Sequence, residues 1–436
     1  MIPFVLDEIR SIAPGRLEVV RGAAVVTGVQ IDSRLIAEGD LFVAVGSGVD
    51  YTAEALERGA AATLVPDDAI AALAALGGAV RERSSARVIA VTGSVGKTTT
   101  KDILGALCGP HAPTVVAEGS QNNEIGLPLT LCRIEARTEV VVLEMGMRGL
   151  GQIAELCKVA RPDVGVITSV GPVHLELLGT VENVARAKAE VIDALPRSGA
   201  AVVPSSEPLL DPYLGRGDLR VVRFGAGGDV RLVSFRPGSG GSEVEVEVLG
   251  ERLELELPLG ARHNATNFLA ALAAYTVLGF PPAAAGRGGA AIKLSRWRGE
   301  ELPLPGGGVL VNDAYNANPL SMAAALDHLA ERAGSSRKVA ILGDMAELGP
   351  GSSEYHRQVG EAAARAGVSV LVAVGPLAAG YLAAEASIPT MRRADDAEAA
   401  LEAATALLEP GDYVLVKGSR SVRLEVVAEG LAGIPA

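Results

Sequence analysis

In Val88-Ile-Ala-Val-Thr-Gly-Ser-Val-Gly-Lys-Thr-Thr-Thr100 an apolar strand runs through a glycine-rich turn into a helix, and this stretch decides the fold. Its glycines allow a tight turn that points backbone N–H groups at phosphate oxygens. The lysine would neutralise phosphate charge, and the threonine after it would bind Mg²⁺ through its hydroxyl. The strand–turn–helix context favours a nucleotide-phosphate loop over a purely structural turn, with its contacts made by Gly93, Ser94, Val95, Gly96, Lys97, Thr98 and Thr99.

The phosphate-loop motif is the shortened Thr-Gly-x-x-Gly-Lys-Thr form. The longer form places a glycine six residues before the lysine, where this chain has Val91. The turn is therefore tighter than usual, and the flanking strand and helix carry the prediction.

Length, charge and cysteine content indicate an α/β enzyme of several domains. A chain of 436 residues suggests about two to four domains, and we expect three. The net charge of −13 argues against a nucleic-acid-binding surface, which needs clustered lysine and arginine. The cysteines Cys108, Cys132 and Cys157 are odd in number and lack metal-pair spacing, so we expect reduced thiols in a cytoplasmic protein.

No segment has the pattern of a secretion signal or a membrane span. The N-terminus has no basic region followed by a cleavable apolar core. The longest apolar run, Phe268 to Phe280, is mostly alanine and stops at Pro281-Pro282, which predicts a buried helix. We therefore expect a cytoplasmic protein with no integral membrane segment.

Strand and helix patterns divide the chain into residues 1–86, 87–299 and 300–436. The first segment holds short strands and an alanine-rich helix, and it ends at the charged connector Arg81–Arg87. In the second, continuous apolar runs predict buried parallel strands of a doubly wound sheet, and an alternating stretch predicts an antiparallel hairpin. After a Gly- and Pro-rich linker, the third segment predicts a Rossmann-like domain. The predicted strands are Val88–Val91, Val140–Leu143, Val164–Thr168 and Ala201–Val203, then Val309–Val311, Val339–Leu342, Val368–Val374 and Tyr413–Val416, with the hairpin at Ser242–Leu257.

Three polar residues follow predicted strands or lie on a helix near them. Glu144 ends an apolar strand, where its carboxylate could hold Mg²⁺ near the phosphate loop or be a solvated strand-end glutamate. His174 follows another strand, where it could be a metal ligand or a polar surface residue. By composition alone, Lys188 is a solvated lysine on an alanine-rich helix.

Three polar clusters are further binding candidates. Ser120-Gln-Asn-Asn-Glu-Ile-Gly126 offers amides to a polar ligand, and Asn312-Asp-Ala-Tyr-Asn-Ala-Asn-Pro319 follows a strand of the third segment. Asx turns are the structural alternative for both. Lys417-Gly-Ser-Arg420 pairs two cations with a glycine turn, which suits an anionic ligand, although it could also be an ordinary charged turn.

Taken in order, these motifs resemble those of the Mur ligase family of peptidoglycan synthesis over nearly the whole chain. Some are family-wide, whereas the last three strings are typical of the ligase that adds D-alanyl-D-alanine. The resemblance is carried by Asp32-Ser-Arg34, Gly39-Asp-Leu-Phe-Val-Ala44, Thr92–Thr98, Asn122–Pro128, His174-Leu-Glu176, Ala187-Lys-Ala-Glu190, Arg262-His-Asn-Ala-Thr-Asn267, Asn312–Pro319, Gly343-Asp-Met-Ala-Glu-Leu-Gly349 and Val416-Lys-Gly-Ser-Arg420.

The resemblance implies an N-terminal domain for a UDP moiety, a central P-loop ATPase domain and a C-terminal Rossmann-like domain. It implies catalytic roles for Lys97, Glu144, His174 and a carbamylated Lys188, with ATP and two Mg²⁺ sites formed by Thr98, Glu144, His174 and Lys188. It further implies that Asn267 meets the adenine, Arg298 the phosphates and Asp313 the ribose. The implied substrate-binding residues are Ser33, Arg34, Asn122, Asn123, Asn316, Lys417, Ser419 and Arg420.

The implied reaction joins D-alanyl-D-alanine to UDP-N-acetylmuramoyl-tripeptide through an acyl phosphate, in a protein expected to be a monomer. One departure concerns the loop after Gly39–Ala44, where the family usually carries Asp-Gly-His and this chain reads Gly48-Val-Asp-Tyr-Thr52. Two rival hypotheses remain. A sister ligase such as folylpolyglutamate synthase would share the later two domains, and a non-catalytic nucleotide switch would share only the phosphate loop.

Overall fold

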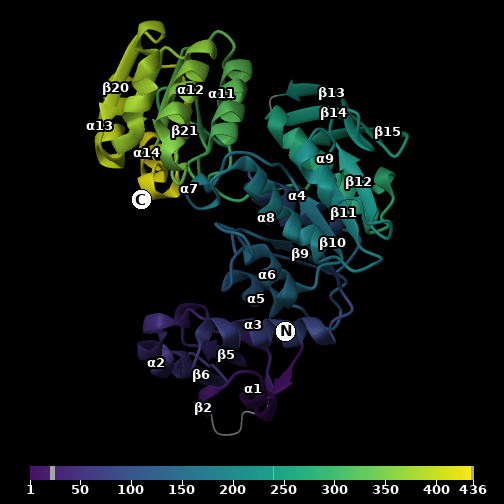
Figure 1. Cartoon of the computed structure of the whole chain (residues 1–436). Helices are drawn as coiled ribbons and strands as arrows, with labels where there is room; N and C mark the ends of the chain where they lie inside the picture. Colours follow the sequence, from purple (N-terminus) through teal and green to yellow (C-terminus); the bar gives the residue numbers. More distant parts are fainter. Residues whose placement is uncertain (20–24, 239, 434–436) are drawn as a thin grey trace.

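The computed structural model of the chain describes residues 1–19, 25–238 and 240–433. It is α/β throughout, and three main sheets follow one another along the sequence. Figure 1 shows them as an N-terminal lobe at the bottom, a central lobe and a C-terminal lobe at the top. This three-domain α/β architecture is the fold class that the sequence predicted.

The N-terminal lobe is a small mixed sheet with helices packed on it. Its strand order is β2-β6-β5-β4, and β1 pairs with β3 beside it. Helix α3 is capped at its N-terminus by the Asp68 side chain, which accepts a hydrogen bond from Ala71 N, and two arginines lie in its last turn. The bounds are β1 Phe4–Val5, α1 Leu6–Ile12, β2 Gly15–Val19, β3 Val25–Val26, β4 Gly28–Gln30, η1 Ser33–Leu35, β5 Asp40–Val43, η2 Gly46–Tyr51, α2 Thr52–Glu57, β6 Ala62–Pro66 and α3 Ala69–Arg83.

The central lobe contains a long sheet with the order β15-β14-β13-β12-β11-β10-β7-β9-β8. Its strands run parallel from β8 to β13. The last pairs, β13–β14 and β14–β15, are antiparallel, so the predicted hairpin is present and extends this sheet. The strands are β7 Arg87–Thr92, β8 Thr114–Val116, β9 Val140–Glu144, β10 Val164–Ile167, β11 Ala200–Pro204, β12 Arg220–Phe224, β13 Val230–Gly238, β14 Gly241–Val248 and β15 Glu251–Leu257.

Helices cover both faces of the central sheet. Alternate residues of β7 point to opposite faces, so Val88 and Ala90 join one core cluster while Ile89 and Val91 join another. The helices and 3₁₀ turns of this lobe are α4 Lys97–Cys108, α5 Gly126–Leu131, α6 Gln152–Ala160, α7 Leu175–Leu178, α8 Val181–Asp193, η3 Pro208–Tyr213, α9 Arg262–Val277, η4 Pro282–Ala284 and α10 Ala285–Gly289. The predicted buried run lies largely in α9, which begins earlier than the run and ends before Gly279.

The C-terminal lobe has the strand order β16-β17-β21-β18-β19-β20, parallel except for β16. Helices α11 and α12 pack on one face, and α13 and α14 on the other. The bounds are β16 Glu300–Pro303, β17 Val309–Asn312, α11 Pro319–Ala333, β18 Lys338–Gly343, η5 Gly349–Gly351, α12 Ser352–Arg365, β19 Val370–Val374, η6 Pro376–Ser387, β20 Thr390–Ala394, α13 Ala397–Leu407, β21 Tyr413–Lys417, η7 Arg420–Val422 and α14 Glu425–Leu431. Strand β19 begins two residues later than predicted.

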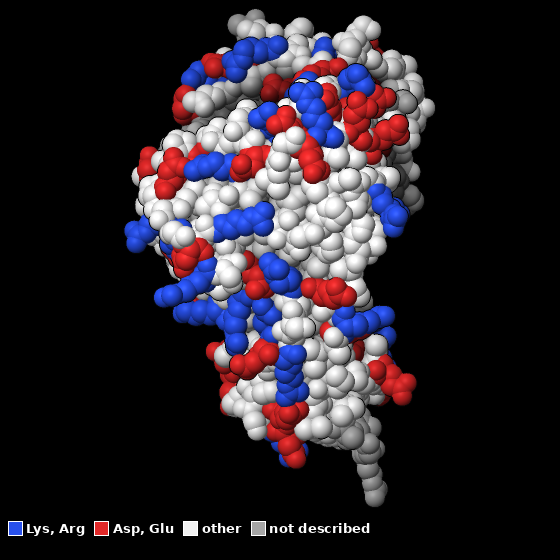
Figure 2. Space-filling view, turned by 90° about the vertical axis from the view of Figure 1, so that its right-hand side faces the viewer, with Lys and Arg blue, Asp and Glu red and all other residues white. Residues whose placement is uncertain are grey.

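The surface carries both signs of charge. On the face drawn in Figure 2, acidic and basic side chains are interspersed between broad uncharged areas. Within the described ranges, the chain has no helix whose length and apolar character would let it cross a bilayer. The described cysteines Cys108, Cys132 and Cys157 are buried and free, and burial raises the pKa of each thiol to about 12.

Candidate active site

A cavity of ≈ 840 Å³ lies between the central and C-terminal lobes. The carboxyl ends of β7, β9 and β10 meet there because these parallel strands are neighbours in the sheet. Most of the residues predicted from the sequence line this one cavity: Gly93, Ser94, Val95, Gly96, Lys97, Thr98, Thr99, Asn122, Asn123, Glu144, His174, Lys188, Asn267, Arg298, Asp313, Asn316 and Lys417.

The phosphate loop needs its glycines for two reasons. Gly93 and Gly96 have φ angles of +149° and +82°, which side-chain-bearing residues rarely adopt. A Cβ on Gly96 would also lie 2.1 Å from Asn267 Oδ1. The missing side chain at Gly96 therefore lets Asn267 of α9 approach the backbone of the phosphate loop directly.

The loop after β10 supports the phosphate loop, and the sequence interpretation missed this loop. Ser94 Oγ donates to Gly171 O at 3.1 Å and accepts from Gly171 N at 3.0 Å, while Val95 N donates to Ser169 Oγ at 2.9 Å. The available signal was the Thr168-Ser-Val-Gly171 string at the end of a predicted parallel strand. Small polar residues at that position fix the backbone of the turn at Ser94 and Val95.

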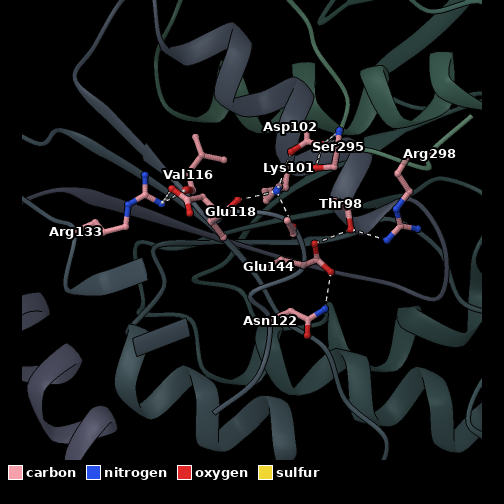
Figure 3. A network of polar contacts seen from close by, with 12 residues as sticks. Thr98, Lys101, Asp102, Val116, Glu118, Asn122, Arg133, Glu144, Ser295 and Arg298 are labelled. Atoms are coloured by element: carbon pink, nitrogen blue, oxygen red, sulfur yellow. Dashed lines mark hydrogen bonds and ion pairs between the residues drawn. The ribbon is translucent and has the colours of Figure 1, made fainter. Parts of the chain in front are cut away.

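A chain of hydrogen bonds joins four of the predicted residues (Figure 3). Arg298 Nη2 donates to Thr98 Oγ1 at 3.0 Å, and Thr98 Oγ1 donates to Glu144 Oε2 at 2.8 Å. Asn122 Nδ2 donates to Glu144 Oε1 at 2.7 Å. Glu144 is only 1% exposed, so its position is fixed by these contacts. The hydroxyl and the carboxylate are oxygen donors of the kind that Mg²⁺ prefers, and they lie together at the end of the phosphate loop.

A second chain of contacts in Figure 3 starts from helix α4, which also carries Thr98, and its residues were not predicted. Lys101 Nζ donates to Ala117 O at 2.7 Å and Gly119 O at 2.9 Å, and it pairs with Asp102 Oδ1 at 2.8 Å. Asp102 accepts from both the backbone N–H and the hydroxyl of Ser295 at 2.8 Å. Helix α4 thereby holds the segment that leads to Asn122 and the segment that leads to Arg298.

Two lysines line the cavity, Lys97 half-buried and Lys188 buried. Lys97 Nζ donates to Gly93 O at 2.9 Å, and burial lowers the pKa of this amine, although Glu144 opposes the shift. Lys188 on α8 is 2% exposed, and burial together with the charge of Lys97 lowers its pKa well below the ordinary value. Among the described residues, no hydrogen bond or ion pair holds the Lys188 amine. This side chain is therefore not the solvated helix lysine that composition suggested.

His174 lies at the start of α7 and contacts the C-terminal lobe. Its Nδ1 meets the carboxylate of Glu347, which also pairs with Arg148 Nε at 3.3 Å. Burial lowers the pKa of the imidazole, Glu347 raises it, and the charges of Lys97 and Lys188 lower it. His174 thus lines the cavity together with Lys97 and Lys188 and also contacts a carboxylate of another lobe.

The C-terminal lobe supplies the opposite wall from the ends of β17 and β21, which are neighbours in their sheet. Lys417 Nζ donates to Asp313 Oδ2 at 2.6 Å and to Asn316 O at 3.0 Å. The Arg298 guanidinium lies 3.9 Å from the ring centroid of Tyr315, and Asn318 Nδ2 donates to Ser94 O at 3.3 Å. Tyr315 and Asn318 belong to the predicted polar cluster Asn312–Pro319, but the sequence assigned neither of them a role.

Four predicted residues do not line this cavity. Ser33 Oγ donates to Glu54 Oε2 at 3.2 Å in the N-terminal lobe, where the exposed Arg34 pairs with Asp32 at 2.6 Å. Ser419 Oγ accepts from Ala346 N at 2.9 Å, and Arg420 pairs with Glu425 at 2.7 Å. Substrate binding by these four residues, away from the cavity, stays a prediction.

The fold and this cavity define a P-loop enzyme whose phosphate loop faces a second, Rossmann-like lobe. Comparison with known proteins identifies the family within this class. Residues 91–275 match the Mur ligase middle domain, and residues 297–420 match the Mur ligase glutamate ligase domain. The chain belongs to the Mur ligase family.

Similar proteins cover the chain almost from end to end. The UDP-N-acetylmuramoyl-tripeptide--D-alanyl-D-alanine ligase of Bacillus subtilis is 32% identical, with 94% of each chain covered. A crystal structure of MurF from Acinetobacter baumannii aligns with a TM-score of 0.87 at 26% identity, covering 99% of both chains. The MurF ligase of Thermotoga maritima in complex with ADP aligns with a TM-score of 0.80 at 29% identity, covering 94% of this chain and 97% of that one.

Proposed function

We propose that this chain uses ATP to join D-alanyl-D-alanine to UDP-N-acetylmuramoyl-tripeptide in peptidoglycan precursor synthesis. The proposal rests on one observation above the others. A single cavity brings together the phosphate loop, Glu144, Lys188 and His174 from one lobe and Asp313 and Lys417 from another. The printed name of the full-length relatives specifies the substrates, and the bound ADP of the Thermotoga maritima protein supports a nucleotide in this cavity.

The nucleotide would lie along the phosphate loop with its phosphates between Lys97 and Arg298. Asn267, which approaches Gly96, would face the base, and Asp313 would face the ribose. Buried cations at fixed positions stabilise the charge of a transferring phosphoryl group far more than exposed ones do. Arg298 lies where the chain enters the C-terminal lobe and packs on Tyr315 of that lobe, so both cations would hold the phosphates only when the lobes are together.

Magnesium fits the donors present. Thr98 and Glu144 would hold it, and the ion would neutralise charge on the phosphate groups when bound. No group of three or more His, Cys, Asp or Glu side chains suited to a metal occurs among the described residues. A second ion near His174 would therefore need a further oxygen donor from this chain.

We propose a carbamylated Lys188 as that donor. A buried amine with a lowered pKa spends more time uncharged, and an uncharged amine can add CO₂ to form an anionic carbamate. An ammonium group at this position would repel a metal ion. The carbamate would instead offer the ion two oxygen donors. The nearby charge of Lys97 would also favour an anion at this position.

In the reaction, the terminal carboxylate of the tripeptide would attack the γ-phosphorus of ATP, releasing ADP and giving an acyl phosphate. The amine of D-alanyl-D-alanine would then attack the acyl carbon and expel phosphate. Phosphorylation is needed because a carboxylate is a poor electrophile. Asn122, hydrogen-bonded to Glu144, lies where the tripeptide and the nucleotide would meet.

We further propose domain divisions at residues 1–86, 87–299 and 300–436, since β7 begins at Arg87 and β16 begins at Glu300. Ser33 and Arg34 would bind the uridine diphosphate on the N-terminal domain. Asn123, Asn316, Lys417, Ser419 and Arg420 would contact the peptide portions of the substrates. The protein would act in the cytoplasm as a monomer.

The test is ADP release measured with each substrate omitted in turn. The proposal expects rapid release only when Mg²⁺–ATP, UDP-tripeptide and D-alanyl-D-alanine are all present. Activity with a folate and glutamate instead would favour the sister ligase, and slow hydrolysis that ignores both substrates would favour a nucleotide switch. Tripeptides ending in lysine or in diaminopimelate would identify the preferred third residue.

A further inference from the structure

Glu347 is a charged residue of the C-terminal lobe that reaches into the central lobe. It follows β18 and precedes η5, and its side chain meets His174 Nδ1 of the other lobe. No step of the proposed reaction uses Glu347. Its position beside a cavity residue therefore needs its own explanation.

Three contacts join this loop to the central lobe. Besides the carboxylate–imidazole contact, Arg148 Nε pairs with Glu347 Oε1 at 3.3 Å, and Glu176 N donates to the Glu347 carbonyl at 3.3 Å. Gly349 approaches so closely that a Cβ on it would lie 3.3 Å from the Glu176 backbone. Backbone and side chain of Glu347 thus both hold the segment His174–Glu176.

Both residues of the central contact have an unusual backbone. His174 has a φ of 52° and Glu347 a φ of 63°, in the left-handed region that favours glycine. Neither is a glycine or an asparagine, so the side chain at each position is kept despite the backbone cost. Two such residues facing each other across two lobes indicate that the pairing itself is used.

The contact has a chemical consequence for His174. With Nδ1 occupied by a carboxylate, Nε2 is the ring nitrogen left for the cavity, which His174 lines together with Lys188. A carboxylate on one imidazole nitrogen fixes the ring orientation and makes the other nitrogen a better donor. Because Glu347 belongs to the C-terminal lobe, this orientation exists only while the two lobes are in contact.

We propose that Glu347 is a positioning residue: it orients His174 when the C-terminal lobe closes, and Arg148 holds its carboxylate in place. The inference rests on the proposed function of the cavity. Closure of the lobes would then have two effects. It would bring Arg298 to the phosphates, and it would fix the orientation of the His174 imidazole.

The test uses Glu347→Gly and Glu347→Gln. Glycine removes the carboxylate but fits a φ of 63° better than glutamate, so a purely structural role predicts an unchanged or raised melting temperature with unchanged turnover. The proposal expects the same melting behaviour but a kcat at least about tenfold lower, with KM for ATP within about twofold. Glu347→Gln keeps the side-chain volume and loses the charge, and we expect an intermediate kcat.

A second readout does not depend on turnover. Amide hydrogen exchange at residues 174–178, measured with ADP bound, should be faster in Glu347→Gly than in the wild type. The matched control is Glu354→Gln, which removes a carboxylate from an exposed ion pair with Arg357 in the same lobe. It should change neither exchange nor kcat.

Wild-type kcat in both Glu347 variants, or unchanged exchange in Glu347→Gly, would overturn the inference. Failure of the proposed function gives a different result, because the wild type itself would then release no ADP with the full substrate set. The exchange experiment still reports on the contact in that case.

Discussion

The central lobe meets the N-terminal lobe through an apolar core and the C-terminal lobe through polar side chains. One core cluster runs from Phe4 and Leu73 of the first lobe to Leu127 and Val141 of the second. On the other side, the contacts include Glu347 with His174, Asn318 with Ser94, and the boundary residue Arg298 with Tyr315. Polar contacts can exchange with water at little cost, whereas an apolar core cannot. From this difference we expect the second junction to open and close more readily than the first.

This difference matches where the chemistry lies. The cavity is at the polar junction, so changes there should reduce turnover with little loss of stability. Changes at the apolar junction should reduce stability and leave turnover alone. The predictions below test this division, beginning with the largest expected effect.

Lys97→Ala should reduce ADP release by about 1,000-fold, because it removes a half-buried cation from the phosphate loop. The measurement is kcat in a coupled ADP assay with all substrates present. Lys158→Ala, at an exposed lysine on α6, is the control and should behave as wild type. Near-normal turnover of Lys97→Ala would reject the phosphate-loop assignment.

Lys188→Ala should lower kcat by about 100-fold, since it removes the proposed carbamate. Added acetate or formate should restore part of the activity by supplying a carboxylate in the space left by the side chain. The assay is kcat against carboxylate concentration, for this variant and for the wild type. A fully active variant would remove the carbamate from the mechanism.

Arg298→Ala should lower kcat by about tenfold, less than Lys97→Ala, because Lys97 still opposes the phosphate charge. The thermal unfolding midpoint should change little, since Arg298 lies at the polar junction, where it contacts Tyr315. Equal losses of turnover and of stability would contradict the division between the two junctions.

Gly77 and Gly78 on α3 offer a matched pair at the apolar junction. A Cβ on Gly77 would lie 2.9 Å from Pro128 Cα of the central lobe, whereas a Cβ on Gly78 would have its nearest neighbour at 4.0 Å. Gly78→Ala should stabilise the protein through helix propensity and Gly77→Ala should destabilise it, a difference of about 2 kcal/mol in unfolding free energy. Denaturant unfolding measures this difference, and kcat should be normal in both. A large kcat effect of Gly77→Ala would show that the first junction also takes part in turnover.

The smallest expected effect is a pH dependence from His328, which lines a second cavity at the polar junction. Burial, with the charges of His263 and Arg332, lowers its pKa from 6.5 to about 4. Between pH 6.5 and 4 the unfolded chain binds a proton at His328 and the folded chain does not. The free energy of unfolding is therefore at its full value above pH 6.5 and decreases as the pH falls toward 4. By pH 5.5 the loss is about 1.4 kcal/mol. Denaturant unfolding from pH 7.5 to 5.5 should show it, and His328→Gln should flatten that slope.

Much of the fold was readable from the sequence because its signals are local. Apolar runs such as Val140–Leu143 mark buried strands, and the alternating glutamates of Ser242–Leu257 mark a half-exposed hairpin. The order of these patterns predicted the doubly wound sheet. No sequence pattern indicated that the N-terminal and central lobes share a core, because that depends on which apolar faces meet.

The site was predicted in part for the same reason. Residues at strand ends, such as Glu144, could be placed near the phosphate loop from the rule that parallel strands end at one edge. Lys188 was different, since composition alone made it a solvated lysine and only the resemblance gave it a role. Glu347 and Lys101 were missed because their partners are far away along the chain or are backbone carbonyls.

The sequence by itself therefore determined the phosphate loop, the α/β class and the family, since each depends on residue types at fixed short spacings. Tertiary structure alone decided the burial of Lys188, the meeting of His174 with Glu347 and the contrast between an apolar and a polar junction. These features depend on how separate segments pack together. Desolvation and charge pairing arise only when that packing brings distant residues within a few ångströms of each other.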